Sequence, residues 1–391
     1  MKSKSISKIE SPTLLSQLKE IRHYLHQHPE LSDQEFKTTK FITSFLEQLG
    51  YKIITPASLK TGVIAEIGPN ETSNVIALRS DIDALPIDEQ TDLNFASENA
   101  GVMHACGHDF HMASLMGAAV LLADNQSKLT SKIRLVFQPA EETNAGAREV
   151  IESGVLNDVA AIIGFHNEPT LAAGEISVSG GVQDAAVDQF KVTLKGIGGH
   201  AAHPNQDVDP IVGLASTITS LQTIVSRNID PIQPSVLSVT HIESGSTWNA
   251  IPDEAWFEGT LRTFSDADAK MGKEKFYQIV QGQAATYGLD VNIEWIEGPR
   301  VLKNDDELAK VLADDAQHYA KLVNVPPTPG GEDFAFYTDK LPSVFAEVGS
   351  GANVGLHHSN LVVDDDGLMT GVKWFYHSAL RLQDYLEEGE Q

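Results

Sequence analysis

The segment His104–His111 packs three histidines, a cysteine and an aspartate into eight residues. Imidazole, thiolate and carboxylate groups are the ligands that zinc and its first-row neighbours prefer, and a short loop can aim several of them at one point. Two other interpretations are a buried cysteine beside surface histidines and a cysteine nucleophile paired with a histidine. The segment holds more ligand types than a Cys–His pair needs, so we expect Cys106 and His108 to bind metal.

Two adjacent carboxylates, Glu141 and Glu142, follow an apolar segment that is predicted to be a strand, Lys132–Gln138. Neighbouring residues in extended backbone point to opposite sides, so the pair can serve one site in different roles. One carboxylate can bind metal while the other moves a proton. The alternative is a solvated surface pair. The position at a strand's carboxyl end favours the functional interpretation.

Further candidates also lie at predicted strand ends. His166 ends an apolar strand, where a polar ring needs a partner, either a metal or a structural hydrogen bond. Asp81 and Asp83 alternate after another strand, which suits metal ligation or the orientation of a ligating histidine, although a plain turn also favours aspartate. The last candidate is the histidine pair in Leu356-His357-His358-Ser359.

The pattern of elements explains why these residues should meet. Apolar residues at helical spacing predict two opening helices, and strands at 61–67, 74–80, 132–138 and 159–166 then alternate with helices at 112–122 and 145–153. This order predicts a largely parallel sheet, whose strand ends collect ligands. A helix at 305–320, a strand at 343–348 and a helix at 370–386 complete this domain.

The middle of the chain has a different order of predicted strands and helices. Strand, helix, two strands, helix and strand follow one another between 187 and 296, which is the order of a ferredoxin-like module. The simplest interpretation is an α/β domain split by an inserted α+β domain. We therefore expect a catalytic domain at 1–184 and 299–391, with the insertion at 185–298.

Composition restricts the partners and the compartment. The chain has 391 residues, with 28 Lys+Arg and 54 Asp+Glu, and a formal net charge of −26. Such acidity opposes binding to nucleic acid and to anionic membranes. Neither a signal-peptide core in Met1–Leu15 nor a span of about 20 apolar residues is found. We therefore expect a soluble, cytoplasmic protein. With one cysteine, no intrachain disulfide can form.

Taken in order, the motifs resemble those of the hippurate hydrolase and N-acyl-amino-acid amidohydrolase group of binuclear metallopeptidases. This group includes the indole-acetyl-amino-acid hydrolases and the N-acetyl-diaminopimelate deacetylases. The resemblance covers essentially the whole chain, and the HACGHDxH block is its most specific part. The matching segments are Arg79–Pro86, His104–His111, Gln138–Glu142, Gly199–Pro204, Asn249–Asp253 and Gly331–Phe334.

The resemblance implies a catalytic domain of metallopeptidase type and a ligand set. Two divalent metals would be bridged by Cys106, with Glu141 as general base. It also implies that the inserted domain acts as a lid, carries a homodimer interface, and contributes His200 and Asn249 to the substrate site. Asn360 follows Ser359 where the group commonly has proline. The remaining metal ligands implied are His108, Glu142, His166 and His358.

Amide hydrolysis would use these groups as follows. Binding to metal lowers the pKa of water to about 7 and so supplies hydroxide at neutral pH. Glu141 would move protons, with Asp83 counted among the catalytic residues. His200, flanked by glycines, would be the donor to the oxyanion. Asn249 and Arg262 would bind the α-carboxylate of an amino acid, the arginine through two parallel hydrogen bonds.

Three functions are compatible with the sequence. The first is a metal-dependent amidohydrolase that releases an amino acid from an N-acetyl or N-aroyl amino acid. The second is a dipeptidase or carboxypeptidase with the same site. The third is a non-catalytic binding protein stabilised by metal, although such a site needs no spare carboxylate. Zn²⁺, Mn²⁺, Co²⁺ and Ni²⁺ all suit the ligands, because availability often decides which metal is bound.

Overall fold

The computed structural model describes residues 12–70, 72 and 74–389, which divide into two compact units. The larger unit contains the described residues up to Gly181 together with 303–326 and 333–389. The smaller unit contains 182–302 and 327–332. From the sequence, this last short segment is expected to belong to the catalytic domain. Residues 1–11, which form most of the stretch searched for a signal peptide, lie outside the described residues.

An eight-stranded sheet forms the centre of the larger unit, with the order β1-β2-β4-β3-β5-β16-β6-β15. The neighbouring pairs β4/β3, β3/β5 and β5/β16 are parallel, whereas β2 and β6 join the parallel strands antiparallel. The mainly parallel sheet predicted from the sequence is thus confirmed at its centre. The strands are β1 (Lys52–Ile53), β2 (Val63–Ile67), β3 (Val75–Asp81), β4 (Lys132–Gln138), β5 (Val159–Glu168), β6 (Glu175–Ser177), β15 (Lys321–Leu322) and β16 (Ser343–Gly349).

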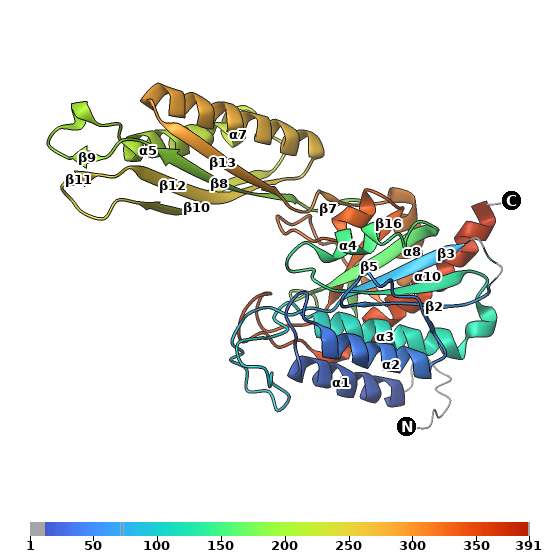
Figure 1. Ribbon diagram of the computed structural model, residues 1–391. Coiled ribbons are helices and arrows are strands. Elements are labelled where there is room, and N and C mark those ends of the chain that lie inside the picture. Colours follow the sequence, from blue (N-terminus) through green and yellow to red (C-terminus); the bar gives the residue numbers. More distant parts are fainter. Residues whose placement is uncertain (1–11, 71, 73, 390–391) are drawn as a thin grey trace. The chain divides into compact units, whose positions relative to one another are not determined.

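Helices cover both faces of this sheet (Figure 1). The helices are α1 (Pro12–Gln27), α2 (Phe36–Gln48), α3 (His108–Asp124), α4 (Gly146–Glu152), α8 (Asp306–Ala316), α9 (Ala335–Thr338) and α10 (Leu368–Gly389), with short 3-10 turns at Gln126–Lys128 and Asp365–Gly367. Of these, α3 and α10 pack against each other, and α1 packs against α3. Within the described residues, no helix combines the length and hydrophobicity needed to cross a bilayer.

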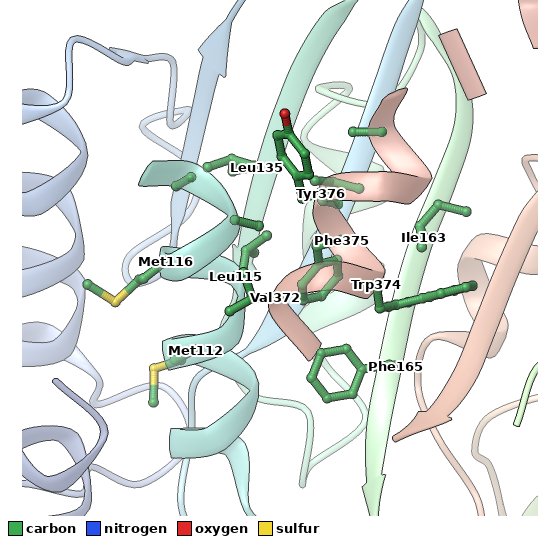
Figure 2. Packing of buried hydrophobic residues seen from close by; sticks show 14 of the residues in the cluster. Met112, Leu115, Met116, Leu135, Ile163, Phe165, Val372, Trp374, Phe375 and Tyr376 are labelled. Atoms are coloured by element: carbon green, nitrogen blue, oxygen red, sulfur yellow. The ribbon is translucent and has the colours of Figure 1, made fainter. Parts of the chain in front are cut away.

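The core lies where α3 and α10 meet the central strands (Figure 2). Ile163 and Phe165 of β5 point to this face, and the fully buried Trp374 donates its indole N–H to the carbonyl of Gly164, at 3.0 Å. Gly164 lies between them in sequence and therefore faces the other side of the sheet. A Cβ there would lie 2.8 Å from Phe334, so the absence of a side chain lets the α9 region pack closely.

The smaller unit is a four-stranded antiparallel sheet with the order β10-β12-β8-β13, covered by helices. In chain order the elements are β8, α5, β10, β12, α7 and β13, which is the ferredoxin-like succession expected from the sequence. The single helix predicted at 209–227 is divided at Gln222. The bounds are β8 (Ala186–Lys195), β9 (Gly199–His200), a 3-10 turn (Pro204–Gln206), α5 (Pro210–Leu221), α6 (Thr223–Arg227), β10 (Ser235–Ser244), β11 (Ala250–Ile251), β12 (Glu254–Thr263), α7 (Asp266–Tyr287) and β13 (Asp290–Glu297), with β7 (Gly181–Asp184) paired to β14 (Leu302–Asn304).

Candidate active site

The candidate residues of the larger unit meet beyond the carboxyl ends of β3, β4 and β5. These strands are parallel neighbours, and Asp81 at the end of β3 is in register with Gln138 at the end of β4. Asp83 and the Glu141–Glu142 pair follow these two ends directly, and His166 lies near the end of β5. The site is therefore built where a parallel sheet gathers the ends of its strands.

Five side chains there direct metal-binding atoms toward one another. Sγ of Cys106 lies 3.4 Å from Nε2 of His166 and 3.2 Å from Nε2 of His357. The carboxylate of Glu142 lies 3.8 Å from Nε2 of His108 and also 3.8 Å from Nε2 of His357. Thiolate, imidazole and carboxylate within this spacing form a donor set of the kind that holds divalent first-row metals.

The unpaired atoms of this cluster support a cation site. Nε2 of His108 and Oε1 of Glu142 are buried and have no hydrogen-bond partner, although they face each other across 3.8 Å. Burial lowers the pKa of His108, but Asp81 and Asp83 raise it further, so that it lies well above its usual value. Burial raises the pKa of Glu142 to about 7. The surroundings thus favour positive charge between these groups, and the residues present fit a bound metal.

Hydrogen bonds at Nδ1 set the orientation of two of the histidine rings. The backbone carbonyl of Asp83 accepts a hydrogen bond from Nδ1 of His108 at 2.9 Å, and the carbonyl of Asn167 accepts one from Nδ1 of His166 at 2.8 Å. A carbonyl oxygen can only accept, so both Nδ1 atoms carry the proton. Burial lowers the pKa of His166 to about 4, which leaves its Nε2 lone pair available to a metal.

The histidine from the last part of the chain that approaches Cys106 is His357, whereas the family resemblance implies His358. The backbone N–H of His357 donates to the carbonyl of Ala105 at 2.7 Å, and its φ of 63° is in the left-handed region. This conformation turns the His357 ring toward Cys106. His358 is exposed and belongs to none of the metal-binding clusters among the described residues. Two adjacent histidines are chemically identical, so only the backbone turn distinguishes them.

A buried network supports the Cys106 loop. It joins Asp81, a candidate from the sequence, to His111 and Asn167, for which the sequence predicts no role. Asp81 accepts a hydrogen bond from Nδ1 of His111 at 2.6 Å, and Nε2 of His111 accepts one from the backbone N–H of Asn167 at 2.9 Å. The side-chain amide of Asn167 donates to the carbonyl of Cys106 at 2.6 Å. Gly107 has a φ of 86°, and a Cβ there would lie 2.4 Å from this amide. His111 and Asn167 thereby fix the backbone that carries Cys106.

Separate hydrogen bonds hold Glu141 and Glu142 in place. The backbone N–H of Asp333 donates to Oε1 of Glu141 at 3.4 Å, and the backbone N–H of Glu142 donates to the Asp83 carboxylate at 3.1 Å. Asp333 itself forms an ion pair with Arg79 at 2.8 Å. Glu141 is buried, and one of its oxygens lies within the same 4.8 Å grouping as His108 and Glu142. Glu141 is therefore placed to exchange a proton beside the cluster of candidate metal ligands.

In the smaller unit, His200 and Asn249 come together, and Arg262 does not join them. His200 in β9 is paired in register with Ala250 in β11, and the carbonyl of Asn249 accepts a hydrogen bond from Ala201 at 3.1 Å. Arg262 lies near the far end of β12, where its guanidinium donates to the carbonyl of Pro329 at 2.7 Å. His200 belongs to the separate two-stranded sheet β11-β9, which follows the end of β8, whereas Arg262 is in register with Val187 at the start of β8. These groups thus lie near opposite ends of β8.

Comparison with known proteins agrees with the fold. The model of peptidase family M20/M25/M40 matches residues 77–381. An N-acetyl-L-cysteine deacetylase of Bacillus subtilis is 47% identical over 97% of this chain and 91% of its own length. An IAA-amino acid hydrolase of Arabidopsis thaliana, ILR1-like 4, is 37% identical over 84% of this chain and 76% of its own.

A solved structure gives the same result. A dinuclear metal-binding peptidase of the M20 family from Bacillus subtilis superposes with a TM-score of 0.85 at 40% identity, over 96% of this chain and 99% of its own. The fold and the site define a metal-dependent hydrolase. The chain belongs to peptidase family M20/M25/M40.

The positions of the two adjacent histidines lead to a test. We expect His357→Ala to weaken metal binding about 10- to 100-fold or more, since a ligand matters at least as much as the groups that orient it. His358→Ala is the matched control and should keep the wild-type metal content. The measurement is bound metal per chain after dialysis, by elemental analysis. Loss of metal in His358→Ala with full retention in His357→Ala would contradict the placement.

Proposed function

We propose that this enzyme hydrolyses the amide bond of N-acyl amino acids, giving a carboxylic acid and a free amino acid. The observation that carries the proposal is the cluster of Cys106, His108, Glu142, His166 and His357 with Glu141 beside it. A site that only binds metal needs no additional buried carboxylate next to its ligands. The relatives named as a deacetylase and as an amino acid hydrolase support the same reaction type.

The five clustered residues would hold two divalent ions, with Cys106 between them. Zn²⁺, Mn²⁺, Co²⁺ and Ni²⁺ all suit thiolate, imidazole and carboxylate ligands. Such ions, when bound, lower the pKa of water and polarise a carbonyl oxygen. Because the cysteine must stay reduced to act as a ligand, a cytoplasmic location is the one we propose.

Proton transfer is the role of Glu141. Its carboxylate takes a proton from the attacking water and later delivers this proton to the leaving nitrogen, so that the amine departs uncharged. The hydrogen bond from the backbone of Asp333 orients the carboxylate, and burial limits exchange of its proton with bulk water. The carbonyl of Asp83 orients the ring of His108, and its carboxylate accepts a hydrogen bond from the backbone N–H of Glu142. Asp83 thereby supports two of the proposed ligands.

Substrate binding involves the smaller unit. His200 is proposed as the donor to the developing oxyanion, and Asn249 and Arg262 as the groups that bind the α-carboxylate. His200 follows the end of β8, and Arg262 is in register with the start of β8. Because these positions are far apart along the strand, we assign His200 and Asn249 to the site of a neighbouring subunit and Arg262 to the site of its own subunit.

A homodimer formed through the smaller unit would bring His200 and Asn249 to the site of the neighbouring subunit. The smaller unit would also act as a lid. The strand β10 lies at an edge of its sheet, where unpaired backbone groups can bind a second chain. Ile242 on this strand is 53% exposed, and Trp248 beside Asn249 is 92% exposed. Apolar side chains this exposed are consistent with burial against another copy.

A substrate panel tests the reaction. With each of the four metals in turn, we expect free amine to be released from N-acetyl or N-benzoyl amino acids. Exhaustive chelation should abolish the release and added metal should restore it. Cleavage of dipeptides alone would favour the peptidase alternative. No turnover across the panel with metal bound would favour the non-catalytic alternative.

Variants of the two adjacent glutamates should have different effects, one on catalysis and the other on metal binding. We expect Glu141→Gln to keep the wild-type metal content and to lower kcat by at least about 100-fold, because the amide cannot accept the proton. Glu142→Ala should lose metal, since it removes a ligand. Metal analysis and steady-state kinetics on the same preparations provide the measurement. The reverse pattern would exchange the roles of base and ligand.

Complementation tests the dimer. We expect Glu141→Ala and His200→Ala to be inactive separately, and an equal mixture that is unfolded and refolded together to regain about a quarter of wild-type activity. Half of the dimers are then mixed, and one of the two sites in each has both residues intact. If mixed dimers are present without any rescue, His200 serves its own subunit and the arrangement across the interface is wrong.

A further inference from the structure

The residue that precedes the two catalytic-site glutamates has an unusual backbone conformation. Ala140 has a φ of 52°, in the left-handed region that residues with a side chain rarely adopt. Its carbonyl accepts hydrogen bonds from the N–H groups of Ala145, at 3.3 Å, and Gly146, at 3.1 Å. The chain therefore turns sharply at Ala140. This turn sets the directions in which Glu141 and Glu142 leave the end of β4.

A buried carboxylate from a distant part of the chain binds this turn. Oε1 of Glu35 accepts a hydrogen bond from the backbone N–H of Ala140 at 2.9 Å, and Oε2 accepts one from the hydroxyl of Thr61 at 2.8 Å. Glu35 is fully buried, and burial raises its pKa to about 7. Burying a carboxyl group is unfavourable unless its hydrogen bonds are satisfied. Both oxygens have a partner here, and one of those partners is the turn.

The position of Glu35 at the start of α2 suggests a different role, that of a helix cap, but the contacts do not support it. The side chain of Glu35 makes no capping hydrogen bond to α2. The first turn of α2 is instead bound by Glu30, whose carboxylate accepts from the backbone N–H groups of Lys37 and Thr38, both at 2.9 Å. The helix start and the Ala140 turn thus have separate carboxylates.

We propose that Glu35 is a positioning residue for the active site, which holds Ala140 in the left-handed conformation and so directs Glu141 as base and Glu142 as ligand. The inference rests on the proposed function of these two glutamates. We assign Glu35 itself neither to the substrate site nor to the metal ligands. Its effect passes through one backbone N–H, and the conformational strain at Ala140 is the reason that a specific hydrogen bond is needed there.

A nearly isosteric pair of variants tests this role. Glu35→Met keeps the length of the side chain and removes the acceptor, whereas Glu35→Gln keeps an acceptor for the Ala140 N–H. We expect Glu35→Met to lower kcat about 10- to 100-fold and to weaken metal binding about 10-fold, as for other groups that orient ligands. Glu35→Gln should stay close to wild type in both. Glu30→Met is the matched control, because it removes the carboxylate at α2 without touching Ala140.

A rescue variant separates positioning from packing. Glycine adopts positive φ without strain, so Glu35→Met combined with Ala140→Gly should regain most of the lost kcat and metal affinity. It should also fold if Glu35→Met alone does not. A purely structural role predicts no such rescue, and predicts similar losses for Glu30→Met. Either of these two results would overturn the proposal.

The metal measurement keeps this test independent of the reaction. Metal affinity is determined by competition with a chromogenic chelator and needs no substrate. If wild-type protein binds metal but turns over no N-acyl amino acid, the proposed function fails. The order of metal affinities among Glu35→Met, Glu35→Gln and the double variant still decides the role of Glu35.

Discussion

The structure depends on holding several carboxylates together at one end of a buried sheet. Asp81, Asp83, Glu141, Glu142 and Asp333 all converge beyond β3 and β4, and like charges at such distances repel strongly where water is excluded. Arg79 offsets two of them, through ion pairs of 2.8 Å to Asp81 and 2.8 Å to Asp333. These two carboxylates then serve as supports for His111 and for the Glu141 region. Glu142 is not paired with Arg79; its carboxylate faces His108 and His357, with which it would bind the cations.

Backbone conformation places the donor atoms as much as side-chain chemistry does. Gly107, Ala140 and His357 all have positive φ, and each lies beside or at a candidate ligand or base. Such turns let short segments change direction abruptly, so that side chains from separate strand ends reach one point. They are unfavourable for residues other than glycine. The hydrogen bonds made by the backbone N–H groups of Ala140 and His357 offset this cost.

Much of this arrangement can be predicted from the sequence, because it depends on patterns within short segments of the chain. Alternating strands and helices predict the parallel sheet, and ligand-type residues at strand ends predict where Cys106, His108, Glu142 and His166 meet. The choice between His357 and His358 depends on a single φ angle that residue type does not reveal. Asn167 and Glu35 act through backbone groups of distant residues, and such contacts leave no pattern in the local sequence. Arg79 stands within a recognised motif, but its pairing with Asp333 spans 254 positions.

The split of the larger unit also determines when the site can exist during synthesis. Asp333, which holds Glu141, and His357, which completes the donor cluster, both follow the inserted unit in the chain. A ribosome that has made the first 300 residues has produced β3, β4 and β5 but neither of these partners. The nascent chain therefore carries an unfinished centre until His357 has been synthesised. A product truncated before Asp333 lacks both partners and cannot assemble the site.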